Sequence, residues 1–312
     1  MRPALAVAGS LNMDFVVSAA RLPAPGETVT GHNFHTAPGG KGANQACAAA
    51  RLSAGRLAVR MIGRCGYDAF GDQLKAGLAA AGADVSGVHA VRAAATGVAM
   101  IEVDAEGRNS IVIAPGANAM LSEADMEQMR PVFAASSFVL FQLESPMGTV
   151  AAGLRIARDE GAETMLDPAP ARALDGEMLR AVDVLTPNES EARILLGREP
   201  GEIELHEAAE AARALLKLGP RAVVLKLGHQ GAFFFDGSVE LFQAGYLVDS
   251  VDSTAAGDTF NAGFAVALAE GKGVAEALRF ACGAAAISVT RSGAQPSIPS
   301  RAEVENFLST RA

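Results

Sequence analysis

The segment DSTAAGDTFN, residues 252–261, carries the strongest signal for fold and chemistry, because it leads into a helical pattern that runs on to Glu270. Its small residues let the backbone approach a ligand closely, and the free N–H groups of residues 255–257 at a helix start form an anion site. Asp258 in the first turn either complements the helix dipole or acts as a general base beside a bound phosphate. For this segment alone we favour the general base.

Short apolar or β-branched runs recur upstream of this segment and alternate with helical stretches. The runs lie at residues 4–8, 58–62, 138–141, 163–166, 182–185 and 222–225. Capping residues mark helix starts at Ser122, at Ser145-Pro146 and at Ser300 with Glu303. Such alternation predicts an α/β fold with a mostly parallel sheet covered by helices on both faces.

Two segments, at about residues 13–37 and 95–114, interrupt the alternation with short strand-like runs separated by Pro, Gly and acidic residues. They predict a small sheet inserted into the α/β body. This sheet is either a pair of ordinary edge hairpins or a lid that excludes water from a reaction centre, and both remain open. No fixed-period repeat or Pro- or Ser-rich linker stands out, so we expect a single domain over residues 1–312.

The composition excludes several classes of protein. Hydrophobic residues make up 50% of the 312 residues, enough for a large core. The 26 Lys and Arg against 35 Asp and Glu give a net charge of −9, which argues against a general nucleic-acid or anionic-membrane binder. Three unpatterned cysteines argue against a disulfide framework or structural zinc and favour the reducing cytoplasm, and no apolar run is long enough for a membrane helix.

Glycine-rich and polar motifs indicate where a ligand binds. The signatures of P-loop, dinucleotide-binding, zincin and α/β-hydrolase proteins are absent from the sequence. PGGKGAN at residues 38–44 offers a backbone path for a polar ligand, with its Lys and Asn as donors, or is only a flexible hinge. GSLNMD at residues 9–14 follows the first strand, where open α/β sheets bind ligands, although an Asx turn is the simpler explanation for this motif alone.

Three further polar or glycine-rich segments follow apolar runs: Glu144, NESE at residues 188–191 and KLGHQG at residues 226–231. Each alone could be capping or turn chemistry. Together they indicate one rim, because the carboxyl ends of parallel strands meet at the same edge of a sheet. We expect that edge to gather Asn12, Asp14, Lys41, Glu144, Asn188, Lys226 and Asp258.

The motifs at residues 9–14, 39–45 and 252–261, with PGET at residues 25–28, resemble those of the ribokinase-like carbohydrate kinase family. Similar segments follow in the family's order at residues 142–146, 167–172, 186–191 and 293–297, so the resemblance spans nearly the whole chain. It implies a three-layer α/β/α sandwich with a mostly parallel central sheet and a small β-sheet lid. In this family the lid often also forms the contact of a homodimer.

The resemblance also implies roles for individual residues. Asp258 would be the catalytic base, and the amides of Ala255, Ala256 and Gly257 would bind the transferred phosphate. The sugar would lie between lid and body, held by Asn12, Asp14, Gly40, Lys41, Asn44, Glu144 and Asp258. The nucleotide would contact Asn188, Lys226, Gly228, Gly231, Gly257 and Cys282.

Two metal ions are implied in the same way. Magnesium would accompany ATP, ordered through water by Glu191, and potassium would act as an activator. The potassium ligands would be Asp252, Thr254, Ser288, Arg291, Gly293 and Ser297, several of them through backbone carbonyls. Members of the family often carry Thr at the position of Lys226 and a polar residue at that of Cys282, so the nucleotide preference stays open.

The implied activity is ATP-dependent phosphorylation of D-ribose at O5, giving D-ribose 5-phosphate and ADP. The enzyme would be cytoplasmic, and its partners would be the sugar and ATP, with neither nucleic acid nor membrane. Two alternatives remain. The same chemistry can act on deoxyribose, another pentose or ketose, or a nucleoside, although Asn12 and Asp14 favour a fully hydroxylated sugar. A non-catalytic sugar sensor is the other, against which the intact Asp258 argues.

Overall fold

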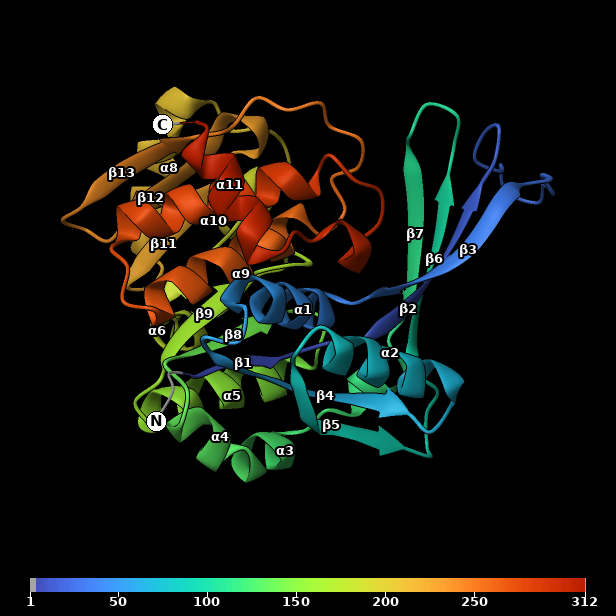
Figure 1. The fold of residues 1–312 in the computed structure, drawn as a ribbon, viewed down its shortest axis with the longest axis horizontal. Coiled ribbons are helices and arrows are strands. Elements are labelled where there is room, and N and C mark those ends of the chain that lie inside the picture. The colour runs from blue at the N-terminus through green and yellow to red at the C-terminus, as the bar shows by residue number, and fades with distance from the viewer. Residues whose placement is uncertain (1–3, 312) are drawn as a thin grey trace.

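A computed structural model describes residues 4–311 (Figure 1). Its body is built on a nine-stranded sheet in the order β13-β12-β11-β10-β9-β8-β1-β4-β5. The strands are β1 (Ala4–Ala8), β4 (Ala58–Gly66), β5 (Asp84–Val91), β8 (Phe138–Gln142), β9 (Glu163–Asp167), β10 (Val184–Leu185), β11 (Ala222–Lys226), β12 (Gly231–Phe235) and β13 (Glu240–Ala244). Neighbours from β5 to β11 pair in parallel, and β12 and β13 extend the sheet antiparallel.

Alternate side chains of the central strands enter two separate cores, because successive residues of a strand point to opposite faces. Leu5 and Val7 of β1 lie in one core, and Ala6 and Ala8 lie in the other. The first core includes α1 (Lys41–Ser53), α2 (Ala69–Ala80), α9 (Ala256–Ala269), α10 (Val274–Ser288) and α11 (Arg301–Ser309). The second includes α3 (Glu123–Gln128), α4 (Arg130–Ala134), α5 (Met147–Asp159), α6 (Gly176–Arg180), α7 (Glu189–Leu195) and α8 (Leu205–Leu216). The predicted α/β/α sandwich is confirmed.

A second sheet of four strands stands beside the body, on the right in Figure 1. Its order is β3-β2-β6-β7, with β2 (Asn12–Ser18), β3 (His32–Gly39), β6 (Gly97–Val103) and β7 (Asn109–Ala114). It is joined closely to the body, because a single residue separates β3 from α1 and Phe15 packs edge-to-face on Phe70 of α2, with ring centroids 5.4 Å apart. We call this sheet the lid.

Several elements differ from the sequence prediction. All six apolar runs contain strands, but only Val184 and Leu185 of the run at residues 182–185 are extended. The prediction lacks β5, β12 and β13. Strands β5 and β13 have no continuous apolar run, since both lie at sheet edges and contain exposed residues. Strand β12 is a buried apolar run that directly follows the glycine-rich segment at residues 226–231. The cap predicted at Ser145 is wrong by one residue, since the extended Pro146 is the N-cap of α5. The caps predicted at Ser122 and Ser300 are confirmed as capping boxes.

The sheet topology determines where a ligand can bind. β1 lies between β4 and β8, so the chain builds the sheet outward from β1 in both directions. Crevices in open α/β sheets form at the carboxyl ends of strands where the order reverses in this way. Short 3-10 helices complete the chain: η1 (Gly116–Met120), η2 (Gly228–Gln230) and η3 (Gln295–Ser297). Within residues 4–311, no helix is both long and apolar enough to cross a membrane.

Candidate active site

The Asp258 carboxylate is buried in the first turn of α9 and is oriented by two side chains of α1. Asn44 donates Nδ2–H to Oδ2 at 3.0 Å, and Gln45 donates Nε2–H to Oδ1 at 3.0 Å. Burial raises the pKa of Asp258 to about 6, against the lowering effects of Lys41 and of the two amide hydrogen bonds. A carboxylate with a raised pKa and a fixed orientation is suited to accept a proton near neutral pH.

The start of α9 offers unpaired backbone N–H groups beside that carboxylate. Ala255 is the N-cap, in the left-handed conformation with φ 59°. The N–H of Ala256 bonds to the carbonyl of Ser253 at 3.1 Å, whereas those of Ala255 and Gly257 have no hydrogen-bond partner among the described residues. With the helix dipole, these two N–H groups form a site for an anion.

Asn12 and Asp14 lie two residues apart on β2, at the junction of the lid and the body. The Oδ1 atom of Asn12 accepts a hydrogen bond from Nδ2 of Asn118 at 2.8 Å, which orients the amide. Burial and the neighbouring Glu144 raise the pKa of Asp14 to about 7. The carboxyl group of Asp14 is therefore poorly hydrated and close to another carboxylate, and the hydroxyl groups of a ligand can donate hydrogen bonds to it.

Glu144 and the glycines of the second motif complete this side of the site. The Oε2 atom of Glu144 accepts hydrogen bonds from Oγ of Ser10 at 2.6 Å and from the backbone N–H of Lys41 at 3.1 Å. Gly40 has φ 88°, and a Cβ atom there would lie 2.7 Å from the backbone nitrogen of Asn12. Only glycine allows the start of β2 and the start of α1 to approach so closely.

Lys41 joins the two halves of the site electrostatically. Burial opposes its charge, but the carboxylates of Asp258, Asp167, Glu144 and Glu191 together raise its pKa. Asn44, one turn further along α1, is buried, and its Oδ1 atom has no partner within residues 4–311. An acceptor left open beside a carboxylate is available to a ligand hydroxyl.

A cavity of about 400 Å³ opens on the other side of the α9 N-terminus. Five of the six residues predicted for the nucleotide line it: Lys226, Gly228, Gly231, Gly257 and Cys282. Most of the other lining residues are small or apolar, among them Tyr246 and Phe260. Burial raises the pKa of the Cys282 thiol to about 12. The cavity has the size of a small-molecule site.

Asn188, the sixth predicted residue, does not line this cavity but adjoins it by a parallel β-bridge to Lys226. It caps α7: its side chain accepts from the N–H of Glu191, and Glu191 accepts from the N–H of Asn188 at 2.7 Å. Burial raises the pKa of Glu191, and Asp167 adds to that effect, whereas Lys226 opposes it. Both residues therefore have a capping role whatever else they bind.

The residues predicted to bind potassium lie in two adjoining segments, one just before α9 and one that begins at the last residue of α10. The carboxylate of Asp252 accepts from the N–H of Gly293 at 2.8 Å and from Oγ1 of Thr254 at 2.6 Å. Ser288 and Ser297 are buried and donate to nearby carbonyls, and Arg291 forms an ion pair with Glu303. Within residues 4–311 no three His, Cys, Asp or Glu side chains form a metal-binding group, so backbone oxygens would have to supply most ligands.

Two central residues, Gln45 and Asp167, are missing from the residues predicted to form the site. Gln45 lies one turn after Lys41, and Asp167 ends the apolar strand β9. The sequence contains a signal for each. Gln45 is four residues from Lys41 and so shares its helix face, and Asp167 is a polar residue at the end of a central strand, where ligands bind. Gln142, Ser10 and Asn118, which hold other site residues in place, were also missed.

Comparisons with known proteins agree with this geometry. The model for pfkB family carbohydrate kinases matches residues 2–301. The chain is 44% identical to the ribokinase of Haemophilus influenzae, with 99% of each chain covered, and 35% identical to the deoxyribokinase of Salmonella typhi, with 98% of each covered. The structure of Arabidopsis thaliana ribokinase complexed with ribose and ATP matches with a TM-score of 0.89 at 35% identity over 99% of each chain. The resemblance drawn from the motifs is confirmed, and the chain belongs to the pfkB family of carbohydrate kinases.

Proposed function

We propose that the protein transfers the γ-phosphoryl group of ATP to O5 of D-ribose, with D-ribose 5-phosphate and ADP as products. The observation that carries this proposal is the position of Asp258. Its carboxylate is held by Asn44 and Gln45 at a helix N-terminus where the N–H groups of Ala255 and Gly257 have no partner among the described residues. The sugar-side residues lie on one side of this point and the cavity of about 400 Å³ on the other.

In this proposal Asp258 removes the proton from the 5-hydroxyl as that oxygen attacks the γ-phosphorus. The bond from the phosphorus to the bridging oxygen breaks, and ADP leaves with that electron pair. The N–H groups of Ala255 and Gly257 would bind the phosphoryl oxygens, where charge accumulates in the transition state. Since Asn44 and Gln45 already orient Asp258, little reorganisation is needed for the proton transfer.

The sugar-side residues support a polyol as acceptor. The carboxylates of Asp14 and Glu144 can accept from hydroxyls, and the Lys41 ammonium can donate to them. Ribose and deoxyribose remain the two acceptors to separate, because relatives with both names match the chain at 44% and 35% identity. The buried pair Asn12 and Asp14 favours ribose, because a missing hydroxyl would leave buried polar groups without a partner.

Magnesium fits the donor side of the site. Around Lys41 and Lys226 lie four carboxylates, those of Asp167, Glu191, Asp258 and Glu144, so negative charge is in excess when all are ionised. Glu191 is the residue we expect to hold the ion through water, and the nucleotide phosphates would supply its other ligands. The ion would offset the charge of the transferred phosphate.

Potassium and the nucleotide base are finer parts of the same proposal. The loops at residues 252–254 and 288–297 would hold potassium through carbonyls, next to the α9 N-terminus. Cys282 and its apolar neighbours would pack on the base. With all three cysteines buried and unpaired, the protein suits a reducing compartment such as the cytoplasm.

We also propose a homodimer formed through the lid. Five large apolar side chains of the lid are exposed: Phe34, Met100, Ile111, Val112 and Ile113. A sheet with an apolar surface and open edges is a site for association. In sedimentation velocity the wild type should be a dimer and Val112→Asp a monomer. A monomeric wild type would exclude this interface.

The deciding experiment measures ADP release from Mg-ATP with D-ribose, 2-deoxyribose, fructose or adenosine, each in potassium or in sodium alone. Strong turnover with ribose that rises in potassium would support the acceptor and the activating ion together. Turnover with deoxyribose alone would replace the acceptor and retain the role of Asp258. Ribose binding without ADP release under any ion condition would leave a sugar sensor instead of an enzyme.

A further inference from the structure

Asp167 is a buried carboxylate at the end of β9 that contacts both halves of the catalytic machinery. Its Oδ2 atom accepts a hydrogen bond from Nε2 of Gln45 at 3.1 Å. Its Oδ1 atom accepts one from Nζ of Lys226 at 3.0 Å. Each oxygen thus has a different partner, one on α1 and one on β11.

Gln45 connects Asp167 to the proposed base. Its Nε2 atom donates to Oδ2 of Asp167 and also to Oδ1 of Asp258, so one amide group serves two carboxylates. The Oε1 atom of Gln45 accepts from Nε2 of Gln142 at 2.7 Å, which fixes the amide with its nitrogen toward the carboxylates. The position of Asp258 therefore depends on a bond that Asp167 also helps to orient.

Lys226 connects Asp167 to the anion site. A Cβ atom built on Gly257 would lie 3.4 Å from Nζ of Lys226, so the ammonium lies over the first turn of α9. Lys226 also lines the cavity of about 400 Å³. Its side chain is 12% exposed and that of Asp167 is 4% exposed, so the pair is largely shielded from water. In such surroundings an ammonium stays in place only with an anionic partner.

We infer that Asp167 is a positioning residue that sets the proton acceptor and the phosphate-binding cation at once: it orients Asp258 through Gln45 and holds the Lys226 ammonium beside the N–H groups of the α9 N-terminus. This inference rests on the proposed phosphoryl transfer. In this arrangement Asp167 acts through Gln45 and Lys226. Its carboxylate keeps Nζ of Lys226 directed at the anion site, where the ammonium can bind the transferred group as charge builds on it.

Three variants separate the link from Asp167 to Asp258 through Gln45 from the contact between Asp167 and Lys226. Asp167→Asn removes the charge that holds Lys226 and leaves a single acceptor oxygen, for which Gln45 and Lys226 compete. We expect kcat to fall about 10- to 100-fold while KM for ribose stays within about threefold. Gln45→Leu cuts only the link to the base and should lower kcat without changing KM for ATP. Lys226→Met removes only the cation and should raise KM for ATP about tenfold as well as lowering kcat.

The double variant Asp167→Asn with Lys226→Met tests whether the two residues act through one contact. Its loss of kcat should be smaller than the product of the two single losses, because both single changes break the same contact and only Asp167→Asn also releases Gln45. Losses that multiply would show independent action and would overturn the inference.

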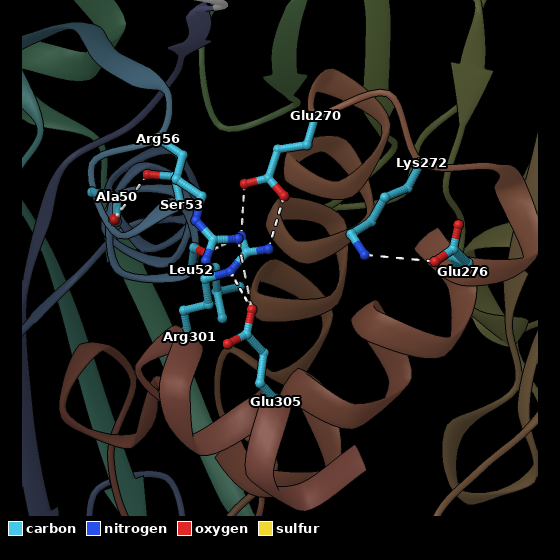
Figure 2. Close-up of polar contacts among 9 residues, drawn as sticks. All are labelled: Ala50, Leu52, Ser53, Arg56, Glu270, Lys272, Glu276, Arg301 and Glu305. Atoms are coloured by element: carbon cyan, nitrogen blue, oxygen red, sulfur yellow. Dashed lines mark hydrogen bonds and ion pairs between the residues drawn. The ribbon is translucent and has the colours of Figure 1, made fainter. Parts of the chain in front are cut away.

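A buried ion pair far from the site provides the matched control (Figure 2). Arg301 at the start of α11 donates to both oxygens of Glu270 at 2.6 and 2.9 Å, and to the carbonyl of Leu52 at 3.1 Å. The side chains of Arg301 and Glu270 are 5% and 12% exposed, close to those of the Lys226 and Asp167 pair. Glu270→Gln should lower the melting temperature and leave kcat and both KM values unchanged.

Thermal unfolding and calorimetric ribose binding, measured on every variant, identify those that have not folded. If Asp167→Asn, like Glu270→Gln, lowers only the melting temperature and keeps kcat within about threefold of the wild type, Asp167 has a structural role and the inference fails. If wild-type protein phosphorylates a sugar other than ribose, the same comparison is made with that sugar. If it phosphorylates none, the proposed function fails, and the inference fails with it.

Discussion

Replacing Asp14 by Asn should stabilise the protein at alkaline pH and weaken sugar binding. Asp14 is buried, and its carboxylate accepts no hydrogen bond from any described residue. Burial and Glu144 raise its pKa from 3.8 to about 7. Asn has the same shape without a charge, so the variant keeps the packing and removes the cost of ionising a desolvated carboxyl group.

The sign and size of this effect follow from linkage. A carboxyl group whose pKa is higher in the folded state contributes stability that is fully present below its unfolded pKa of 3.8 and is lost as the pH rises through about 7. The difference between these pKa values corresponds to about 4 kcal/mol of unfolding free energy above pH 7. Between about pH 4.5 and pH 8.5, wild type should therefore lose about 3 kcal/mol relative to Asp14→Asn.

Urea unfolding of both proteins across this pH range, without sugar, measures the effect. Asp68→Asn is a control of opposite sign: burial opposes the charge of Asp68, but hydrogen bonds from Thr96 and Gly71 lower its pKa, so removing that charge should destabilise most at high pH. A free-energy difference between wild type and Asp14→Asn that does not change with pH would refute the reasoning. Calorimetry should find weaker ribose binding by the Asp14→Asn variant, because the amide has lost one acceptor.

Three further predictions concern the chemistry and the backbone. Asp258→Asn should lower kcat about 100- to 10,000-fold in an ADP-release assay while ribose still binds, and undiminished turnover would contradict its role as the base. Because burial raises the pKa of Asp258 to about 6, kcat/KM of the wild type should fall about tenfold per pH unit below that value, and a rate profile flat to about pH 5 would exclude an essential base with this pKa. Gly40→Ala should abolish ribose binding in calorimetry because its Cβ atom would lie 2.7 Å from the backbone nitrogen of Asn12, whereas Gly26→Ala, with φ 81° and no atom within 4 Å, should cost only about 1 kcal/mol in urea unfolding.

The arrangement of the site along one sheet edge could be predicted because it depends on local rules. Apolar runs bounded by helix signals become parallel strands, and parallel strands end at one edge. Asn12, Glu144 and Lys226 each follow or end such a run, and the structure gathers them near that edge. The prediction lacks β5 and β13, which are edge strands without a continuous apolar run, and β12, an apolar run that follows the glycine-rich segment at residues 226–231.

The pairing of polar groups inside the site could not be predicted in the same way. Gln45 reaches Asp258 only because α1 and α9 pack side by side, which depends on contacts between residues more than 200 positions apart. Lys226 stands where members of the family often carry Thr, and nothing in the sequence pairs it with Asp167. A charge pair between two strand ends requires both the strand order and the side-chain directions, and neither follows from spacing in the sequence.

Three carboxylates of the site have raised pKa values. The pKa values of Asp14, Asp258 and Glu191 are raised because burial outweighs their partners. Most other shifted carboxylates have lowered pKa values, because hydrogen bonds from Arg side chains, helix N-termini or turns stabilise the charge. Burial also raises the pKa values of Glu163 and Glu189, which lie outside the site, and nearby acidic residues add to that effect. Where burial keeps a carboxylate from its charge, a ligand hydroxyl or cation has the most to offer it, and Asp14 and Asp258 lie in such a position at the start of the lid and at the N-terminus of α9.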